Sequence, residues 1–481
     1  MDLVIRLDGT GAKTVLVYRA LREAIVDGRL PVGERVPPTR VLAADLGVAR
    51  GSVAIAYERL VAEGYLTARV GSGTFVASVA SGGPRAARSV VDPLRPRASW
   101  PLTPLPTSGN GVAPRYDFRT GIPDAGLFPF DAWRRLVAAE LRLRANSPGT
   151  YAEPSGQPAL RNAIARYVGI SRGIKTRGDD VVVTNGTQHA LDLIGRVLLT
   201  PGDIVAVEEP GYPPPRRLFQ AMGCRVVGVP VDEEGLVVTA LPPQTKLVYA
   251  TPSHQFPLGG AMSLGRRREL LAWAAGRSAA IVEDDYDSEF RFSARPLEPL
   301  VSLDTHGRVL YVGTFSKSMV PAIRTGFALV PGGLRDAVVA ARQVSDGYGQ
   351  TAVQAALARF IDEGQLARHV RKASKEYGSR HAAIVRALRE ISSLVVIPSS
   401  AGLHVTALAR ADPAPVVAEA ARAGLAVENL RDYSTTRAGA VNDLRDYSTT
   451  QAGFVFGFGA VDASLIDEGM ALFAAILARH A

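Results

Sequence analysis

From Tyr116 to the C-terminus the chain alternates short β-branched runs with longer helical stretches, and this alternation limits the possible folds more than any other feature. The runs include DDVVVT, DIVAVEE, KLVYAT, AAIVED and RVLYVGT. Each is apolar almost throughout, which is typical of strands that are buried on both faces. Such strands, separated by helices, predict an α/β domain with a mostly parallel central sheet covered on both sides.

The N-terminal part of the chain follows a different pattern. An amphipathic helix begins near Val17, Thr39 is suited to be the N-cap of a second helix, and a third helix is expected from about Arg50 to Glu63. The segment YLTARVGSGTFVA then has the β-rich residues and central glycines of a hairpin. Two helices joined by a short turn and followed by a hairpin predict a winged helix-turn-helix.

Residues 79–115 separate these two parts and are rich in Pro, Gly, Ser and Arg, which predicts a flexible linker. We therefore expect a DNA-binding domain over 1–78, the linker, and a large domain over 116–481 that divides near residue 370 into a large and a small subdomain. Of the net charge of +9, +6 falls within residues 1–115, where 15 Lys and Arg face 9 Asp and Glu. A basic N-terminal region suits a polyanionic partner such as DNA.

The bulk features predict a cytoplasmic protein. No apolar run approaches the roughly 18 residues that a membrane helix needs. The N-terminus lacks the basic start and apolar stretch of a signal peptide. Cys224 is the single cysteine, so it forms no internal disulfide and we expect it to be a buried apolar thiol, with no metal cluster.

The segment GTFSKSMVPAIRTG contains one of only six lysines in the chain, Lys317, directly after a predicted strand. A lysine at this place suits a Schiff base with an aldehyde cofactor. The hydroxyls of Thr314 and Ser316 and the guanidinium of Arg324 can bind the cofactor's phosphate. Tyr212, in EEPGYPPP, is placed where an aromatic ring can stack on the cofactor.

Two further segments complete the predicted cofactor site. In IVEDDYDSEF, Asp284 can pair with a pyridine nitrogen and keep it protonated, while the Tyr286 hydroxyl can reach the ring O3′. In VVVTNGTQHALDL, the backbone amides of Gly186, Thr187 and Gln188 open a predicted helix, which forms an anion site for the phosphate.

These motifs together resemble a known family. The segment from DGRLPVGERVPPTR to TARVGSGTFV resembles the GntR-type winged helix, and EEPGYP, TPSHQFPLG, EDDYDSEFRF and GTFSKSMVPAIRTG resemble the fold-type I aminotransferases. Their combination is similar to the MocR/GabR-type transcription regulators, which fuse the two domains. The resemblance covers about residues 14 to 481.

The resemblance implies pyridoxal 5′-phosphate (PLP) as the cofactor, Lys317 as the lysine that holds it, and Asp284, Tyr286 and Tyr212 around its ring. It also implies a homodimer, in which Tyr151 reaches a phosphate across the interface, and a double-stranded DNA operator as a partner. The DNA contacts that it implies are Arg40, Arg50, Ser52, Arg69 and Gly71.

The sequence departs from the catalytic relatives at two places. Where those enzymes have NPTG, this chain has FPLG, so Phe256 replaces an asparagine and His254 or Gln255 is left as a substitute. Where they have an arginine that clamps the substrate carboxylate, FVFGF places Val455. Without a bidentate clamp an ordinary amino acid binds and orients poorly. The arginines that could serve instead are Arg431, Arg437 and Arg445.

We therefore predict a PLP-dependent transcription regulator that senses the cofactor, or an amine that forms an external aldimine in place of Lys317. The large domain is then used for sensing rather than for turnover. The alternative is a working aminotransferase with an attached DNA-binding domain, which keto acid formation at enzyme-like rates would favour.

A local duplication lies near the C-terminus. LRDYSTTRAGAVND at 430–443 is followed at once by LRDYSTTQAGFVFG at 444–457, and ten of the fourteen positions are identical. Two copies are too few for a solenoid. We interpret the duplication as an enlarged surface loop.

Overall fold

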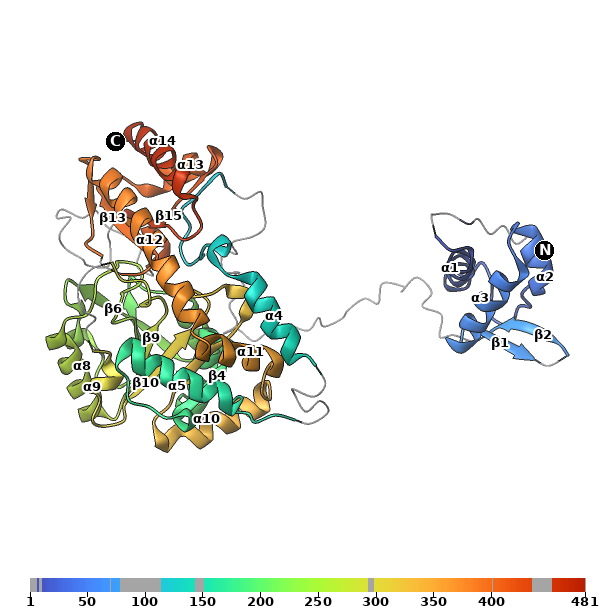
Figure 1. Cartoon of the computed structure of the whole chain (residues 1–481), viewed down its shortest axis with the longest axis horizontal. Helices are drawn as coiled ribbons and strands as arrows, with labels where there is room; N and C mark the ends of the chain where they lie inside the picture. The colour runs from blue at the N-terminus through green and yellow to red at the C-terminus, as the bar shows by residue number, and fades with distance from the viewer. Residues whose placement is uncertain are drawn as a thin grey trace. The chain divides into compact units, whose positions relative to one another are not determined.

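The computed structural model describes residue 7 and residues 11–69, 71–77, 114–142, 151–292, 298–399, 401–434 and 452–480. The chain divides into two compact units, residues 1–96 and 97–481 (Figure 1). The predicted linker over 79–115 lies outside the described residues, apart from its last two positions. Each unit is described below by itself.

The first unit is a winged helix-turn-helix, as predicted. Its helices α1 (Lys13–Val26), α2 (Thr39–Asp45) and α3 (Arg50–Ala62) precede the antiparallel hairpin β1 (Leu66–Arg69) and β2 (Gly73–Val76). The side chains of Leu21, Val53 and Leu60 are fully buried between the helices. The prediction that Thr39 is the N-cap was wrong by one residue: Thr39 is already helical and the extended Pro38 is the cap, because proline fixes φ just where a helix begins.

The second unit is an α/β domain built around one twisted sheet. The strand order is β4-β11-β10-β9-β8-β5-β6-β7. The central strands β10, β9, β8, β5 and β6 are all parallel, and β11 is antiparallel to both of its neighbours. The strands are β4 (Val181–Thr184), β5 (Ile204–Glu209), β6 (Arg225–Asp232), β7 (Gly235–Leu236), β8 (Thr245–Ala250), β9 (Ala280–Asp285), β10 (Val309–Thr314) and β11 (Gly326–Leu329).

Helices cover both faces of this sheet, which confirms the predicted fold class. Successive side chains of a strand point to opposite faces. Accordingly Val181 and Val183 pack with one set of helices and Val182 with the other. The first set is α4 (Phe130–Glu140), α5 (Pro158–Arg172), α8 (Leu264–Arg277), α9 (Leu300–Leu303) and α11 (Thr351–Asp362), and the second is α6 (Thr187–Leu198), α7 (Pro213–Ala221) and α10 (Gly332–Ser345).

The C-terminal elements form a smaller sheet with its own core, drawn in orange and red in Figure 1. Its strand order is β12-β13-β16-β15, all antiparallel. Helix α12 (Gln365–Arg389) runs through the predicted subdomain division near residue 370. The elements are β12 (Leu394–Val396), β13 (His404–Ala409), α13 (Pro413–Arg422), β15 (Glu428–Asn429), β16 (Gly453–Gly457) and α14 (Ile466–Ala478), with a short parallel pair β3 (Tyr116–Asp117) and β14 (Leu425–Ala426).

The duplicated segment contributes one part of each copy to this sheet. The first copy begins with the 3₁₀ turn η5 (Leu430–Tyr433), and the second copy ends with strand β16. The prediction that the duplicated segment 430–457 is a surface loop was wrong at both ends, because Leu430 and the whole of β16 are buried. Residues 435–451 lie outside the described residues.

Two of the predicted bulk features can be checked in the structure. Cys224 is free and buried, in agreement with the prediction. Within the described ranges, no helix combines the length and the apolar character that crossing a membrane requires.

Candidate cofactor site

Lys317 lies three residues beyond the end of β10, at the carboxyl edge of the parallel strands. Its Nζ donates a hydrogen bond to the carbonyl oxygen of Gly121 at 2.6 Å. Burial lowers the pKa of this amine, and the nearby carboxylates of Asp287 and Asp284 act in the opposite direction. A lowered pKa increases the share of neutral amine, which is the form that attacks an aldehyde.

Asp284 occupies the end of the neighbouring strand β9. Its Oδ2 accepts a hydrogen bond from the Tyr249 hydroxyl on β8 at 2.7 Å. Its Oδ1 is buried and has no hydrogen-bond partner. Burial raises the pKa of Asp284 to about 7. A buried acceptor without a partner is costly, so this oxygen fits a protonated ring nitrogen that would pair with it.

The start of helix α6 fits a phosphate. Gly186 caps the helix with a φ of +84°, and Thr187 and Gln188 form its first turn. The Arg324 Nη2 donates to the carbonyl oxygen of Asn185 at 2.8 Å, and a Cβ added at Gly186 would lie 3.5 Å from Arg324 Nη1. The start of the helix and the Arg324 guanidinium therefore lie next to each other, as an anion site requires.

The remaining predicted residues of this region adjoin that space. The Thr314 hydroxyl donates to Ser316 Oγ at 3.0 Å in the turn before Lys317. The ring of Tyr212, the N-cap of α7, lies edge-on to the Phe256 ring with their centroids 5.5 Å apart. Burial and the Asp284 carboxylate raise the pKa of Tyr212 to about 12, while Arg324 acts in the opposite direction. Asp284 and Arg324 therefore both act electrostatically on Tyr212.

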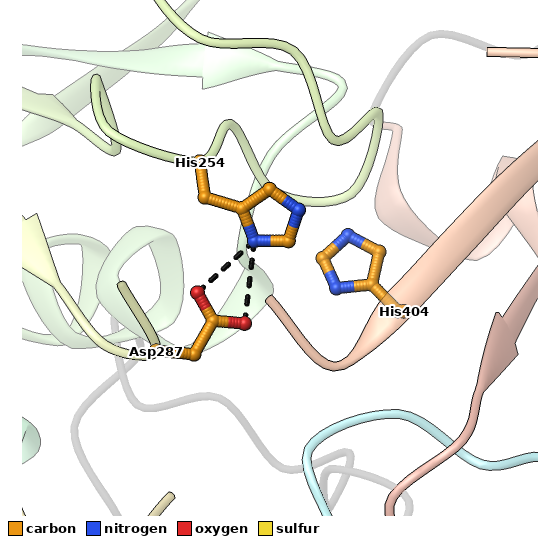
Figure 2. A group of neighbouring side chains, drawn as sticks. All are labelled: His254, Asp287 and His404. Atoms are coloured by element: carbon orange, nitrogen blue, oxygen red, sulfur yellow. Dashed lines mark hydrogen bonds and ion pairs between the residues drawn. The ribbon is translucent and has the colours of Figure 1, made fainter. Parts of the chain in front are cut away.

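Tyr286 is half-buried and belongs to a network with the buried residues His254 and Asp287. Its hydroxyl donates to the carbonyl oxygen of His254 at 2.9 Å and lies 3.1 Å from His254 Nδ1. The same Nδ1 lies 3.0 and 3.2 Å from the two carboxylate oxygens of Asp287, as Figure 2 shows. A carboxylate is an acceptor only, so Nδ1 carries a proton toward Asp287.

This network continues into the small sheet. Asp287 Oδ2 accepts a hydrogen bond from the backbone amide of Leu403 at 3.1 Å, and His254 Nε2 lies 3.2 Å from Ser399 Oγ. The His404 ring, at the start of β13, lies next to the His254 ring (Figure 2), with centroids 4.5 Å apart and an angle of 38° between the ring planes. The network thus joins the cofactor side of the domain to the C-terminal sheet.

His254, Asp287 and His404 bring their ligand atoms within 4.8 Å of one another, which is close enough for a shared metal ion. The hydrogen bonds argue against that use, because His254 Nδ1 is already engaged by Asp287 and by the Tyr286 hydroxyl. His404 Nε2 also donates to the carbonyl oxygen of Pro257 at 3.0 Å, and burial lowers the pKa of His404 to about 3. The arrangement therefore favours a hydrogen-bonded network over a shared metal ion.

The structure also shows how the two departures are accommodated. Of the two substitutes for the missing asparagine, Gln255 directs its amide to the carbonyl oxygens of Pro210 and Phe256, whereas His254 adjoins Tyr286. Val455 is fully buried in β16. Among the arginines suggested as replacements, Arg431 pairs with Asp412 at 2.7 Å, and Arg437 and Arg445 lie outside the described residues.

Tyr151 stands apart from the other predicted residues. Its side chain is 93% exposed and its nearest ring partner is Tyr348, with centroids 6.2 Å apart. In the first unit, Arg40, Arg50 and Arg69 are exposed, Ser52 is half-buried in the first turn of α3, and Gly71 is in the β1–β2 turn. The Arg69 guanidinium lies 5.1 Å from the centroid of the Phe75 ring, which orients it on the wing.

Two protein families match the two units of the chain. Residues 13–76 match the bacterial regulatory proteins of the gntR family, and residues 122–434 match the class I and II aminotransferases. The probable rhizopine catabolism regulatory protein MocR of Rhizobium meliloti is 38% identical over 81% of this chain and 80% of its own length. The chain belongs to the MocR/GabR-type transcription regulators.

Another relative of this MocR/GabR-type regulator is the pyridoxine biosynthesis regulator PdxR of Corynebacterium glutamicum, 32% identical over 92% of this chain and 91% of that protein. Among solved structures, the kynurenine aminotransferase of Pyrococcus horikoshii has a TM-score of 0.67 and 28% identity, covering 75% of this chain and 90% of that one. LysN of Thermus thermophilus, solved with N-(5′-phosphopyridoxyl)-L-leucine, has a TM-score of 0.66 and 25% identity, covering 75% and 92%. The regulator is therefore a DNA-binding protein with PLP as its cofactor.

Several residues of the site escaped the sequence analysis. Tyr249, Asn185 and Asp287 lie in or next to segments that the motifs covered, and strand alternation could have placed Tyr249 beside Asp284. Gly121 and Glu428 come from distant parts of the chain, and no spacing rule links either of them to Lys317.

Proposed function

We propose that this regulator senses a primary amine, or PLP itself, at Lys317 and transmits the occupancy of the site to its DNA-binding unit. The observation that carries the proposal is that two groups suited to PLP occur in one site. One is the Lys317 amine, whose pKa burial lowers, and the other is the buried Asp284 oxygen that has no hydrogen-bond partner. The same chain also carries a winged helix. A transcription regulator needs no turnover, only two states of its ligand site with different affinity for DNA.

Each predicted site residue has a role in this proposal. When bound, PLP supplies an aldehyde that condenses reversibly with primary amines. Lys317 holds the cofactor through this aldehyde, Asp284 pairs with the ring nitrogen, and Tyr212 packs on the ring. Tyr286, kept in place by His254, serves the ring oxygen. The phosphate is bound by the residues that open α6 and follow β10, which are Gly186, Thr187, Gln188, Thr314, Ser316 and Arg324.

The buried network offers a physical route by which occupancy reaches the rest of the chain. An amine that takes the place of Lys317 frees the lysine, which then donates to Gly121, and alters the surroundings of Tyr286. Tyr286 contacts His254, and His254 and Asp287 contact Ser399 and Leu403 at the edge of the small sheet. Movement of that sheet is therefore sensitive to what lies beside Tyr286.

Assembly and DNA contacts complete the proposal. The exposed Tyr151 supports a homodimer in which this side chain reaches the partner's phosphate site. The predicted DNA contacts are Arg40, Arg50, Ser52, Arg69 and Gly71, and arginine can bind either phosphate or the guanine edge. Because the partner is genomic DNA, we place the protein in the cytoplasm.

Transamination is a second candidate function, favoured by the fold and by the buried lysine. An aromatic amino acid aminotransferase of Thermococcus litoralis is 34% identical over 56% of this chain and 67% of its own length. The buried Val455, in the place of a carboxylate-binding arginine, weighs against it. Keto acid formation at roughly 1 to 1000 per second would favour the enzyme over the sensor.

The test uses the full-length protein loaded with PLP, beside Lys317→Ala. We expect a visible absorption band that is lost in the variant, because only the lysine can hold the aldehyde covalently. DNA selected from a random pool by the loaded protein then serves as the probe in a binding titration with and without primary amines.

An amine that changes both the absorption band and the DNA affinity supports the proposal. If the band responds to amines but DNA affinity is the same in every state, sensing fails while cofactor binding stands. If neither protein shows a band after PLP is added, the assignment of Lys317 itself is wrong.

A further inference from the structure

A short chain of contacts links Lys317 to a carboxylate that neither the motifs nor the comparisons assign. Lys317 Nζ donates to the Gly121 carbonyl oxygen at 2.6 Å. The preceding residue, Thr120, has its Oγ1 3.5 Å from the Tyr433 hydroxyl, and Tyr433 donates to Glu428 Oε2 at 2.5 Å. These contacts connect Glu428, on the small sheet, with the loop that accepts the hydrogen bond from Lys317.

Glu428 is held in place by both backbone and side-chain contacts. It lies on β15 and pairs with Val455 of β16. Partial burial raises the pKa of Glu428, and hydrogen bonds from Tyr433 and Thr120 act in the opposite direction. The charge of Glu428 in turn raises the pKa of Lys317, so its field reaches the amine.

Two arginines near Glu428 are paired with aspartates, although Arg119 also acts electrostatically on Glu428. Arg119 forms a bidentate pair with Asp117 at 2.7 and 2.6 Å, and Arg431 pairs with Asp412. Glu428 pairs in register with the uncharged Val455, the position where the sequence comparison with catalytic relatives leads us to expect an arginine. A carboxylate-bearing ligand would meet a like charge here, and a ligand with a second ammonium group would meet an opposite one.

We propose that Glu428 makes this site selective for effector amines that carry a second cationic amine, such as short linear diamines. One amine occupies the position of the Lys317 amine, and the distal ammonium is held by the Glu428 carboxylate. Tyr433 keeps that carboxylate oriented. The inference rests on the proposed amine-sensing function and adds the ligand class.

The experiment compares three amines of equal chain length on the PLP-loaded full-length protein. The probes are 1,4-diaminobutane, 1-aminobutane and 4-aminobutanoate, and the readout is the dissociation constant from the change in cofactor absorbance, checked by calorimetry. A charge-assisted contact on the order of 1.4 kcal/mol corresponds to a tenfold difference in affinity. We expect the diamine to bind at least tenfold more tightly than 1-aminobutane, and 4-aminobutanoate to bind more weakly than either.

The matched variants are Glu428→Gln and Asp432→Asn. Glu428→Gln keeps the size of the side chain and an acceptor for Tyr433, so it should remove the advantage of the diamine and leave 1-aminobutane unchanged. Asp432 is exposed in the turn η5, which follows β15, and serves as the control, with the full preference for the diamine retained.

The outcomes separate this inference from the function on which it rests. If the amines change the absorbance but the diamine has no advantage, or if its advantage survives in Glu428→Gln, the role of Glu428 is wrong and amine sensing stands. If none of the amines changes the absorbance, amine sensing fails, and the selectivity fails with it.

Discussion

At the scale of single residues, the cofactor site holds charges that are costly without a ligand. Asp284 is buried, and only one of its two oxygens is hydrogen-bonded. Lys317 is buried at a distance from which the Asp284 charge still acts on it. Buried charged groups of this kind are common at functional sites, where contacts with a bound ligand offset the free-energy cost of removing the charges from water.

This cost predicts an unusual pH dependence of the cofactor-free protein. Asp284 ionises near pH 4 in an unfolded chain and near pH 7 in the folded one, so the folded state holds more protons in this window. The free energy of unfolding should therefore fall as the pH rises from about 4 to about 7. Asp284→Asn should reduce that fall by an amount on the order of 2 kcal/mol, measured by urea unfolding at pH 5 and pH 7.5.

The control for this measurement is the PLP-loaded wild type. A protonated ring nitrogen beside Asp284 stabilises the carboxylate, so the loaded protein should lose less stability over the same pH range. Parallel pH profiles of cofactor-free wild type and Asp284→Asn would show that Asp284 does not titrate in this window.

At the scale of elements, the strands and the strand-end residues could be predicted because they are encoded locally. A continuous β-branched run marks a buried strand, and the carboxyl ends of parallel strands converge, so Asp284 and Lys317 could be assigned to one site. Glu428 and Gly121 could not, because they reach Lys317 through the packing of the small sheet against a loop 300 residues earlier in the chain. The cap at Pro38 was missed because helix ends shift by a residue when proline precedes a good cap.

The joint between the two sheets depends on a turn with no room for a side chain. Gly402 has a φ of +81°, and a Cβ there would overlap the His254 ring and approach Asp287. We expect Gly402→Ala to destabilise the protein by about 3 kcal/mol or more, because both the backbone conformation and the buried hydrogen bond between His254 and Asp287 must yield. The measurement is the thermal midpoint, followed together with PLP absorbance.

Gly276→Ala is the matched control for this variant. Gly276 is inside α8, and a Cβ there meets nothing within 4 Å. Alanine at that position should leave stability unchanged or raise it by up to about 1 kcal/mol. Equal effects of the two substitutions would contradict a special role for the turn at Gly402.

At the scale of the whole molecule, DNA binding and cofactor binding are carried by separate compact units. The hydrophobic core of the winged helix is closed by its own residues, among them Leu21, Val53 and Leu60. Substitutions at the DNA-contacting surface should therefore leave the cofactor site intact.

Arg50→Ala in the full-length protein tests this separation. Loss of one arginine contact typically costs about 1 to 3 kcal/mol, so we expect DNA affinity to fall roughly five- to 150-fold with unchanged PLP absorbance. Arg29→Ala is the control, since Arg29 pairs at the surface with Asp27 and is not among the predicted contacts. Equal losses for the two variants would indicate nonspecific charge attraction rather than a contact by Arg50.

The described parts of the duplicated segment come from different copies, and this bears on how easily the chain can be lengthened here. The first copy supplies Tyr433 and the second supplies β16, so both sides of the connection are fixed while 17 residues, 435–451, join them. With a single copy of the segment, the connection would have three residues. Closing the longer loop costs only about 1.5 kcal/mol more in chain entropy, because that cost grows with the logarithm of loop length. A tandem duplication at this point therefore lengthens the chain at a thermodynamic cost that one or two additional buried contacts offset.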